Sequence, residues 1–120
     1  MKHLMYLAGP MTSPNQADNA SRAARMARKL EHLHSGLVLF VPHYLYWANL
    51  AAPRDYTYEE WMNYDFSVIE HCEGLLRMIG ESPGADREVE FALSRGLPVF
   101  LQKLRGSAAF EGLKDWLGEK

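Results

Sequence analysis

Four short apolar runs alternate with segments of helical length, and this alternation limits the fold more than any other feature of the 120-residue chain. The runs occupy residues 3–8, 37–41, 75–79 and 97–101. Short apolar runs that end at glycine or proline are typical of buried strands. Strands joined through helices predict right-handed crossovers and a parallel sheet. We therefore expect one α/β domain over residues 1–120, a three-layer flavodoxin- or Rossmann-like parallel sheet of four to five strands with helices on both faces.

Amphipathic stripes predict the helices between these runs. Small residues share one stripe of the first helix, which is expected to run from the loop at Asn15 to about His34. Ser82 is a favourable N-cap, and Pro83 suits the first helical position. The remaining helices are predicted over about 58–72, 83–95 and 108–117, with a short helix before Pro53.

Composition narrows the range of functions. The chain is 48% hydrophobic and 23% charged with a formal net charge of −2, which gives no electrostatic case for a nucleic acid polymer or a membrane surface as partner. No apolar run approaches the length of a membrane span, and the first strand begins almost at once, so we expect neither a span nor a signal peptide. Cys72 is the one cysteine, which favours an inert core thiol in a reducing, cytoplasmic compartment. The five histidines show no metal-ligand spacing, so no metal site is predicted.

Two carboxylates fall on helix stripes that are otherwise apolar. Glu88 shares its stripe with alanine and valine, and Asp65 lies on the stripe of Trp61 and Ile69. In parallel sheets ligands bind beyond the carboxyl ends of the strands. The loop 9–15, the Pro42–His43 step and the turn before Glu88 all belong to that edge, so the acids are expected to meet there.

A pair of acids in a partly dry cleft suits a reaction that passes through an oxocarbenium-like sugar cation. Glu88, near a helix N-terminus, is predicted to stay ionised and act as the nucleophile. Asp65, on an apolar stripe, is predicted to carry the proton. The alternative is that either acid caps a loop or pairs with Arg77 or Arg87. This chemistry needs no metal or organic cofactor.

Three motifs in sequence resemble the nucleoside 2-deoxyribosyltransferase superfamily: residues 6–12 (YLAGPMT), residues 65–69 (DFSVI) and residues 82–88 (SPGADRE) with Ala92 and Gly96. The resemblance covers nearly the whole chain in order and spacing. The superfamily includes base-exchanging transferases, 2′-deoxynucleoside 5′-phosphate N-hydrolases and small uncharacterised bacterial and phage proteins, and the chain is most similar to the last group.

The resemblance implies roles for individual residues. Glu88 would attack C1′ of the sugar, Asp65 would protonate or position the base, and Tyr6 would lie beside the nucleophile. The substrate-binding residues would be Gly9, Pro10, Met11, His43, Ser82 and Gly84.

Ser82 lies six residues before Glu88, where relatives that transfer bases tend to have an aspartate and the phosphate hydrolases have a serine. A neutral hydroxyl at a helix start tolerates a phosphate dianion that a carboxylate would repel. Ser82 therefore favours a nucleotide substrate, with a plain N-cap as the alternative.

Several other polar and aromatic residues have two interpretations each. His43 either touches a base or phosphate or is a loop histidine without chemistry. Tyr44, Tyr46 and Trp47 either stack a base or lie in a dimer interface, and the interface is favoured. Arg77 either binds phosphate or marks an edge or interface, and again the latter is favoured. The basic residues of the first helix are expected to form a solvated face.

Relatives complete their sites with a residue from a neighbouring subunit, so the resemblance implies a homodimer or a higher homo-oligomer, with Ser107 as the candidate residue. The expected activity is an N-glycosidase that cleaves the base–sugar bond of a (2′-deoxy)nucleoside 5′-monophosphate through a covalent glycosyl-Glu88 intermediate. The alternatives are a nucleoside 2-deoxyribosyltransferase, a catalytically silent nucleotide-binding protein or a purely structural subunit.

Overall fold

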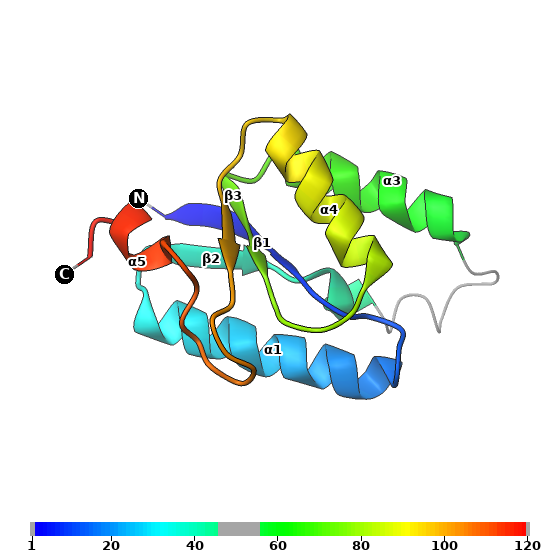
Figure 1. The fold of residues 1–120 in the computed structure, drawn as a ribbon, viewed down its shortest axis with the longest axis horizontal. Helices are drawn as coiled ribbons and strands as arrows, with labels where there is room; N and C mark the ends of the chain where they lie inside the picture. Colours follow the sequence, from blue (N-terminus) through cyan, green and yellow to red (C-terminus); the bar gives the residue numbers. More distant parts are fainter. Residues whose placement is uncertain (1, 46–55, 120) are drawn as a thin grey trace.

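Four parallel strands form a single sheet at the centre of the computed structural model, which describes residues 2–45 and 56–119. The strands are β1 (His3–Ala8), β2 (Leu37–Phe40), β3 (Gly74–Arg77) and β4 (Val99–Leu101). Their order across the sheet is β2-β1-β3-β4 (Figure 1). Successive strands are added to one side of β1 and then to the other, so the strand order reverses between β1 and β3. In flavodoxin-like sheets this reversal opens the crevice in which ligands bind.

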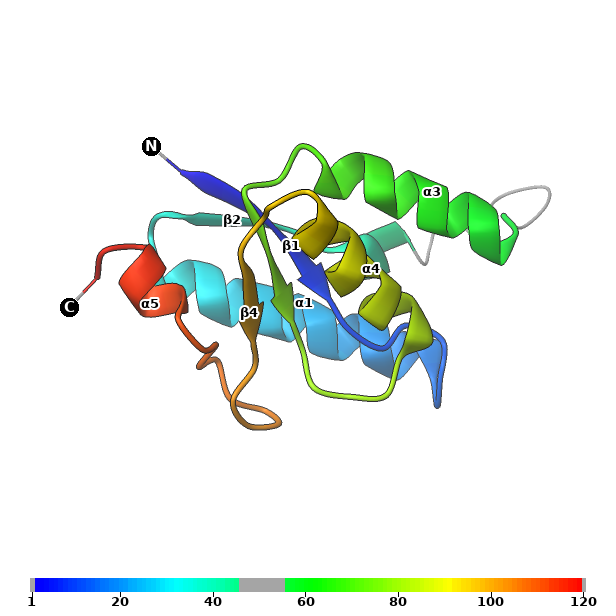
Figure 2. The same ribbon diagram turned by 45° about the horizontal axis from the view of Figure 1, so that its top comes forward.

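Helices cover both faces of the sheet, as predicted. Helix α1 (Gln16–Leu33) packs on one face, and α3 (Tyr58–Ile69) and α4 (Pro83–Ser94) lie side by side on the other (Figures 1 and 2). Two shorter elements, the 3-10 helix η1 (Pro42–Leu45) and helix α5 (Leu113–Trp116), follow β2 and β4. The predicted three-layer α/β fold is confirmed.

The alternation of side chains along β1 divides the core into two halves. Met5 and Leu7 point into the apolar cluster under α1, whereas Tyr6 and Ala8 point into the cluster under α3 and α4. All four are fully buried. A shift of β1 by one residue would turn the Tyr6 side chain to the other face of the sheet. In the observed register it lies in the same layer as the helix stripes that carry Asp65 and Glu88.

Strand β4 is shorter than the predicted run 97–101 because its first residues close the preceding helix. Gly96 adopts the left-handed conformation with φ +75°, and the Leu97 amide donates to the carbonyl of Ala92. This is the arrangement of a glycine-terminated helix, which satisfies carbonyls that would otherwise be unpaired. The Leu97 amide, which would begin the predicted strand, therefore donates to the helix and not to a neighbouring strand.

The last predicted helix, 108–117, is also mostly wrong. Only Leu113–Trp116 is helical, because Gly112 is left-handed at φ +83° and Phe110 pairs with Gln102 in an isolated β-bridge. Of the other predicted boundaries, α3 ends at Ile69 instead of Cys72 and β3 covers Gly74–Arg77 instead of 75–79. Most of the segment for which a short helix is predicted before Pro53 lies outside the described residues. No helix within the described ranges is long and apolar enough to cross a membrane.

Candidate active site

A tyrosine and two acids from three elements meet at the carboxyl end of β1. The Tyr6 hydroxyl donates to Oε2 of Glu88 at 2.6 Å, and Asp65 lies close enough to both residues to shift their pKa values. Asp65 and Glu88 are each 5% exposed and Tyr6 is fully buried. The structure thus brings together the three predicted catalytic residues, from β1, α3 and α4.

Burial dominates the electrostatics of this group. It raises the pKa of Glu88 well above the ordinary value, and the neighbouring Asp65 raises it further. Burial likewise raises the pKa of Asp65 and of Tyr6. Acids this close titrate as a pair, so the pair retains a proton at a pH where separate carboxyls would both be ionised.

Helix α4 does not hold the pKa of Glu88 low, as the prediction of an ionised Glu88 assumed. Helix α4 begins at Pro83, so Glu88 is its sixth residue and lies beyond the first turn. The effect of the helix dipole falls off within that turn. Burial and Asp65 therefore outweigh it.

A cavity of about 350 Å³ lies over the acid pair. This volume suits a small molecule. Most of the residues predicted for catalysis or substrate binding contribute to its wall. They are Gly9, Pro10, Met11, Asp65, Ser82, Gly84 and Glu88. Glu88 and Asp65 thus share one opening.

Helix α3 lines the same cavity with aromatic and apolar side chains that the sequence analysis did not assign to the site. Tyr58, Trp61 and Met62 all line it together with Asp65. Their spacing of i, i+3, i+4 and i+7 is one stripe of a helix, and that periodicity is the signal that could have identified them. Further residues of the wall are Thr12, Ser13, Pro42, Glu81, Pro83 and Ala85.

His43 lies behind the cavity and does not line it. The side chain is 2% exposed, its Nε2 is 2.9 Å from the Pro10 carbonyl, and its Nδ1 has no partner within the described residues. Burial lowers the pKa of His43, so the ring is neutral near pH 7 and Nε2–H donates to Pro10. In this structure His43 supports the Gly9–Pro10 loop from the outside.

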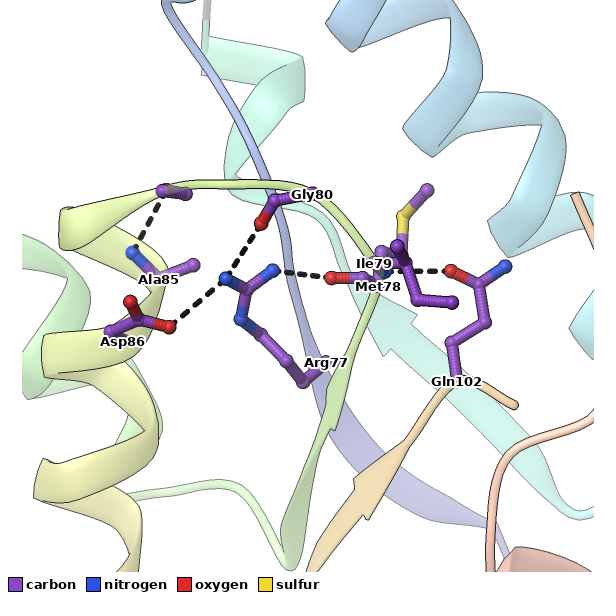
Figure 3. A network of polar contacts seen from close by, with 8 residues as sticks. Arg77, Met78, Ile79, Gly80, Ala85, Asp86 and Gln102 are labelled. Atoms are coloured by element: carbon purple, nitrogen blue, oxygen red, sulfur yellow. Dashed lines mark hydrogen bonds and ion pairs between the residues drawn. The ribbon is translucent and has the colours of Figure 1, made fainter. Parts of the chain in front are cut away.

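Arg77 does not line the cavity either. Its guanidinium donates to the carbonyls of Met78 and Gly80 and to Oδ1 of Asp86 (Figure 3). On the other side of the same segment, Oε1 of Gln102 accepts from the Ile79 amide at 2.7 Å. We call Arg77, Asp86 and Gln102, with the backbone groups they bind, the loop clamp.

The position of β3 corrects the prediction that Arg77 marks an edge of the sheet. Strand β3 lies between β1 and β4, so Arg77 is not on an edge strand. Its terminal nitrogens bind groups of the loop that leads to α4 instead of groups in the cavity wall. Arg87 pairs with Glu59 at 2.7 Å, so the two arginines considered as partners for the acids bind other carboxylates.

The clamped loop lies very close to the loop that follows β1. Gly80 has φ +139°, and a Cβ there would lie 2.4 Å from Cγ of Pro10. Glycine is therefore required both by the backbone and by the close approach.

The clamped loop ends at Ser82, the N-cap of α4. Oγ of Ser82 accepts from the Ala85 amide at 3.1 Å. Its own O–H is not used in this bond and can donate to another group. The cap and a ligand contact are therefore compatible.

The remaining sequence-based predictions have mixed outcomes. Cys72 is buried and burial raises its pKa to about 11, as expected for an inert thiol. Tyr44 is half exposed, and Tyr46 and Trp47 lie outside the described residues. Oγ of Ser107 accepts from the Ala109 amide. Within the described ranges no three His, Cys, Asp or Glu side chains converge on a point that could hold a metal.

Fold and site define a flavodoxin-like α/β protein with a buried acid pair beneath a small-molecule cavity at the carboxyl edge of its sheet. The chain belongs to the DUF4406 family, described as a domain of unknown function, which matches residues 3–101. A search of curated proteins finds no match.

Two solved structures share the fold. One is a conserved protein from Enterococcus faecalis V583, with a TM-score of 0.64 and 19% identity over 84% of this chain. The other is a 2-deoxyribosyltransferase from Bacillus psychrosaccharolyticus, described as a biocatalyst for nucleoside synthesis, with a TM-score of 0.56 and 23% identity over 87% of this chain. The chain spans 63% and 74% of their respective lengths. At these identities the similarity shows the fold alone, and the fold is the one that the resemblance implied.

Proposed function

We propose that the protein is an N-glycosidase that cleaves the base–sugar bond of a (2′-deoxy)nucleoside 5′-monophosphate. The observation that carries the proposal is the meeting of Tyr6, Glu88 and Asp65 beneath a 350 Å³ cavity that the two acids line. A buried acid pair with one shared proton combines a nucleophile and a proton donor in one place. The fold of a 2-deoxyribosyltransferase supports the same chemistry.

Glu88 is the nucleophile in this mechanism. The proton that the pair shares first passes from Glu88 to Asp65. The Glu88 carboxylate then attacks C1′, the C1′–N bond breaks, and the electron pair leaves with the base, which takes the proton from Asp65. Tyr6 donates to Oε2 of Glu88 and so favours the ionised form that attacks. Water then adds to C1′ and displaces Glu88, while the ionised Asp65 accepts the proton of the water. Two displacements at C1′ give net retention.

The walls of the cavity suit the two ends of such a substrate. Tyr58 and Trp61 offer aromatic rings to a base, and base–aromatic stacking contributes about 1–3 kcal/mol per base. Ser82, in the same wall, presents a hydroxyl at the start of α4. A helix start binds an anion through unpaired N–H groups.

Base release from deoxynucleoside monophosphates tests the proposal directly. Free base should appear with wild-type protein and fall by at least ~10³-fold in Glu88→Gln, because removal of a covalent nucleophile costs several kcal/mol of the barrier. Glu90→Gln, at an exposed position on the same helix, is the matched control and should retain full activity. Wild-type protein without base release, or equal loss in both variants, would refute the proposal.

Base exchange is the second candidate, and the shared fold with a 2-deoxyribosyltransferase favours it. Addition of a competing free base distinguishes the two. If a new nucleotide forms in place of free sugar phosphate, the glycosyl intermediate is resolved by a base and the protein is a transferase. Tight nucleotide binding by calorimetry without base release would instead identify a silent binding protein.

A further inference from the structure

A groove with four cationic side chains continues from the candidate active site along helix α1. The 350 Å³ cavity shares Pro10, Ser13, Glu81 and Pro83 with a neighbouring cavity of about 500 Å³. That cavity in turn shares Arg22 and Arg105 with a third cavity of about 270 Å³. The three hollows therefore adjoin one another, and we refer to them in this order as a path.

The far part of this path is strongly basic. Arg22, Arg25 and Lys29 come from α1, and Arg105 comes from the loop after β4, which closes the other side of the groove. Positions 22, 25 and 29 lie on one stripe of the helix, which rises about 10 Å from the first to the last. We call these four residues the basic groove. Part of the face of α1 that was predicted to be plainly solvated thus lines a hollow.

None of the four cations is neutralised within the described ranges. No ion pair or side-chain hydrogen bond there joins them to a carboxylate, whereas Arg77, Arg87 and Arg95 each have an acidic partner. Glu81, at the junction with the active-site cavity, is the one acidic side chain among the described residues that line the two outer cavities. Like charges gathered in one concave site repel one another and attract an anion.

The active-site cavity has the opposite charge balance. The described residues of its wall include Asp65, Glu81 and Glu88 and no lysine or arginine. A first phosphate can bind at the start of α4 beside Ser82. Further phosphates that extend past Glu81 would enter the neighbouring cavity, which Arg22 and Arg105 line. One guanidinium group can donate two parallel hydrogen bonds to the oxygens of a phosphate, so arginine suits this role.

We propose that the basic groove binds the phosphate chain of a nucleoside di- or triphosphate whose base and sugar occupy the active-site cavity, which extends the proposed substrate class beyond the monophosphate. The identity of the ligand as a nucleotide rests on the proposed function, but the binding of a phosphate chain does not. The shared chemistry is a linear oligophosphate. Its source is either the nucleotide itself or a free polyphosphate that binds beside it.

Calorimetric titration with sodium tripolyphosphate near physiological salt tests the groove without reference to turnover. Wild-type protein should bind, and the double variant Arg22→Ala/Arg105→Ala should weaken binding by at least ~10-fold, since it removes two charged hydrogen-bond donors. Arg28→Ala is the matched control, because Arg28 is an exposed arginine of α1 that does not line the groove. It should change affinity less than ~2-fold. All three substituted side chains are exposed, and an unchanged melting temperature verifies the fold.

A second titration assigns the source. A nucleoside triphosphate should bind wild-type protein at least ~10-fold more tightly than the corresponding monophosphate, and the double variant should lose this advantage. Lack of tripolyphosphate binding, or equal weakening by Arg28→Ala, would overturn the basic groove. Tripolyphosphate binding without any triphosphate advantage would overturn the nucleotide as its ligand. Absence of base release with tripolyphosphate binding intact would refute the proposed function and leave the groove standing.

Discussion

The loop clamp binds the turn that joins β3 to α4, whereas the acid pair lies between α3 and α4, and the two differ in how their polar atoms are satisfied. In the loop clamp the Arg77 guanidinium and the Gln102 amide bind carbonyls, an amide and a carboxylate (Figure 3). In the acid pair, Oδ1 of Asp65 is buried without a partner among the described residues. Satisfied polar groups stabilise a loop, whereas buried unsatisfied ones cost free energy and mark places where a ligand can supply the missing partner.

This contrast leads to opposite expectations for substitutions. Changes in the loop clamp should lower stability and affect activity only through the position of α4. Changes in the acid pair should lower activity and leave stability equal or higher. The predictions below test this contrast, from the largest expected effect to the smallest.

Glu88→Gln should reduce base release by at least ~10³-fold and yet raise the melting temperature at pH 8 by about 4 °C or more. Burial raises the folded-state pKa of Glu88 above its ordinary 4.5, so the folded protein holds the proton more tightly than the unfolded chain. Stability therefore falls as pH rises from about 4.5 through the raised pKa. Glutamine keeps the shape and stays neutral, so calorimetric scans should show the gain at pH 8 and none at pH 4. An unchanged melting temperature at pH 8 contradicts the predicted gain, and a lower one contradicts the contrast itself.

Arg77→Met should lower the free energy of unfolding by about 3 kcal/mol, because two partly buried carbonyls lose their donor. Urea unfolding measures this loss. The control is Lys103→Met, which removes an exposed ion pair with Glu111 at 3.7 Å and should cost less than about 0.5 kcal/mol. Similar losses in both variants would show that the clamp contributes no more than a surface pair.

Tyr6→Phe should reduce base release by about 10–100-fold, the range that corresponds to one hydrogen bond to a charged group. Without the donor at 2.6 Å the Glu88 carboxylate is harder to form, so the pKa of Glu88 should rise further. The acid limb of the pH–rate profile should then move to higher pH. An unchanged limb would mean that Tyr6 does not tune Glu88. Tyr44→Phe, at an exposed position, provides the comparison.

Substitutions of Ser82 distinguish its structural role as a helix cap from a role in binding phosphate. Their expected effect on stability is the smallest of the four. Ser82→Ala removes the N-cap of α4 and should cost about 1 kcal/mol, whereas Ser82→Asp restores an equally good cap. If Ser82 also contacts a phosphate, Ser82→Asp should bind a nucleoside monophosphate more weakly than wild type but bind the unphosphorylated nucleoside equally well. Calorimetric titration with the two ligands measures the difference. Unchanged affinity for both ligands would reduce Ser82 to its role as a cap.

The sequence pattern alone was sufficient for the layers of the fold and for several parts of the site. The stripes of two helices predicted that Asp65 and Glu88 point inward. The place of Tyr6 beside Glu88 was implied by the family resemblance. The shortened β4 and the truncated last helix were not predictable in the same way. Each depends on a cap or bridge beside a glycine whose backbone conformation a pattern does not specify.

What the sequence by itself determined is the direction in which each side chain leaves its helix or strand, because the periods of 3.6 and 2 are local properties of the backbone. What only the tertiary structure decided is which of those side chains meet. The Tyr6–Glu88 hydrogen bond joins residues 82 positions apart. The direction of the Arg77 guanidinium depends on its bonds to Gly80 and Asp86. The pKa of Glu88 also depends on the tertiary structure. It is raised by burial and by the nearby Asp65, and the sequence of α4 specifies neither of these.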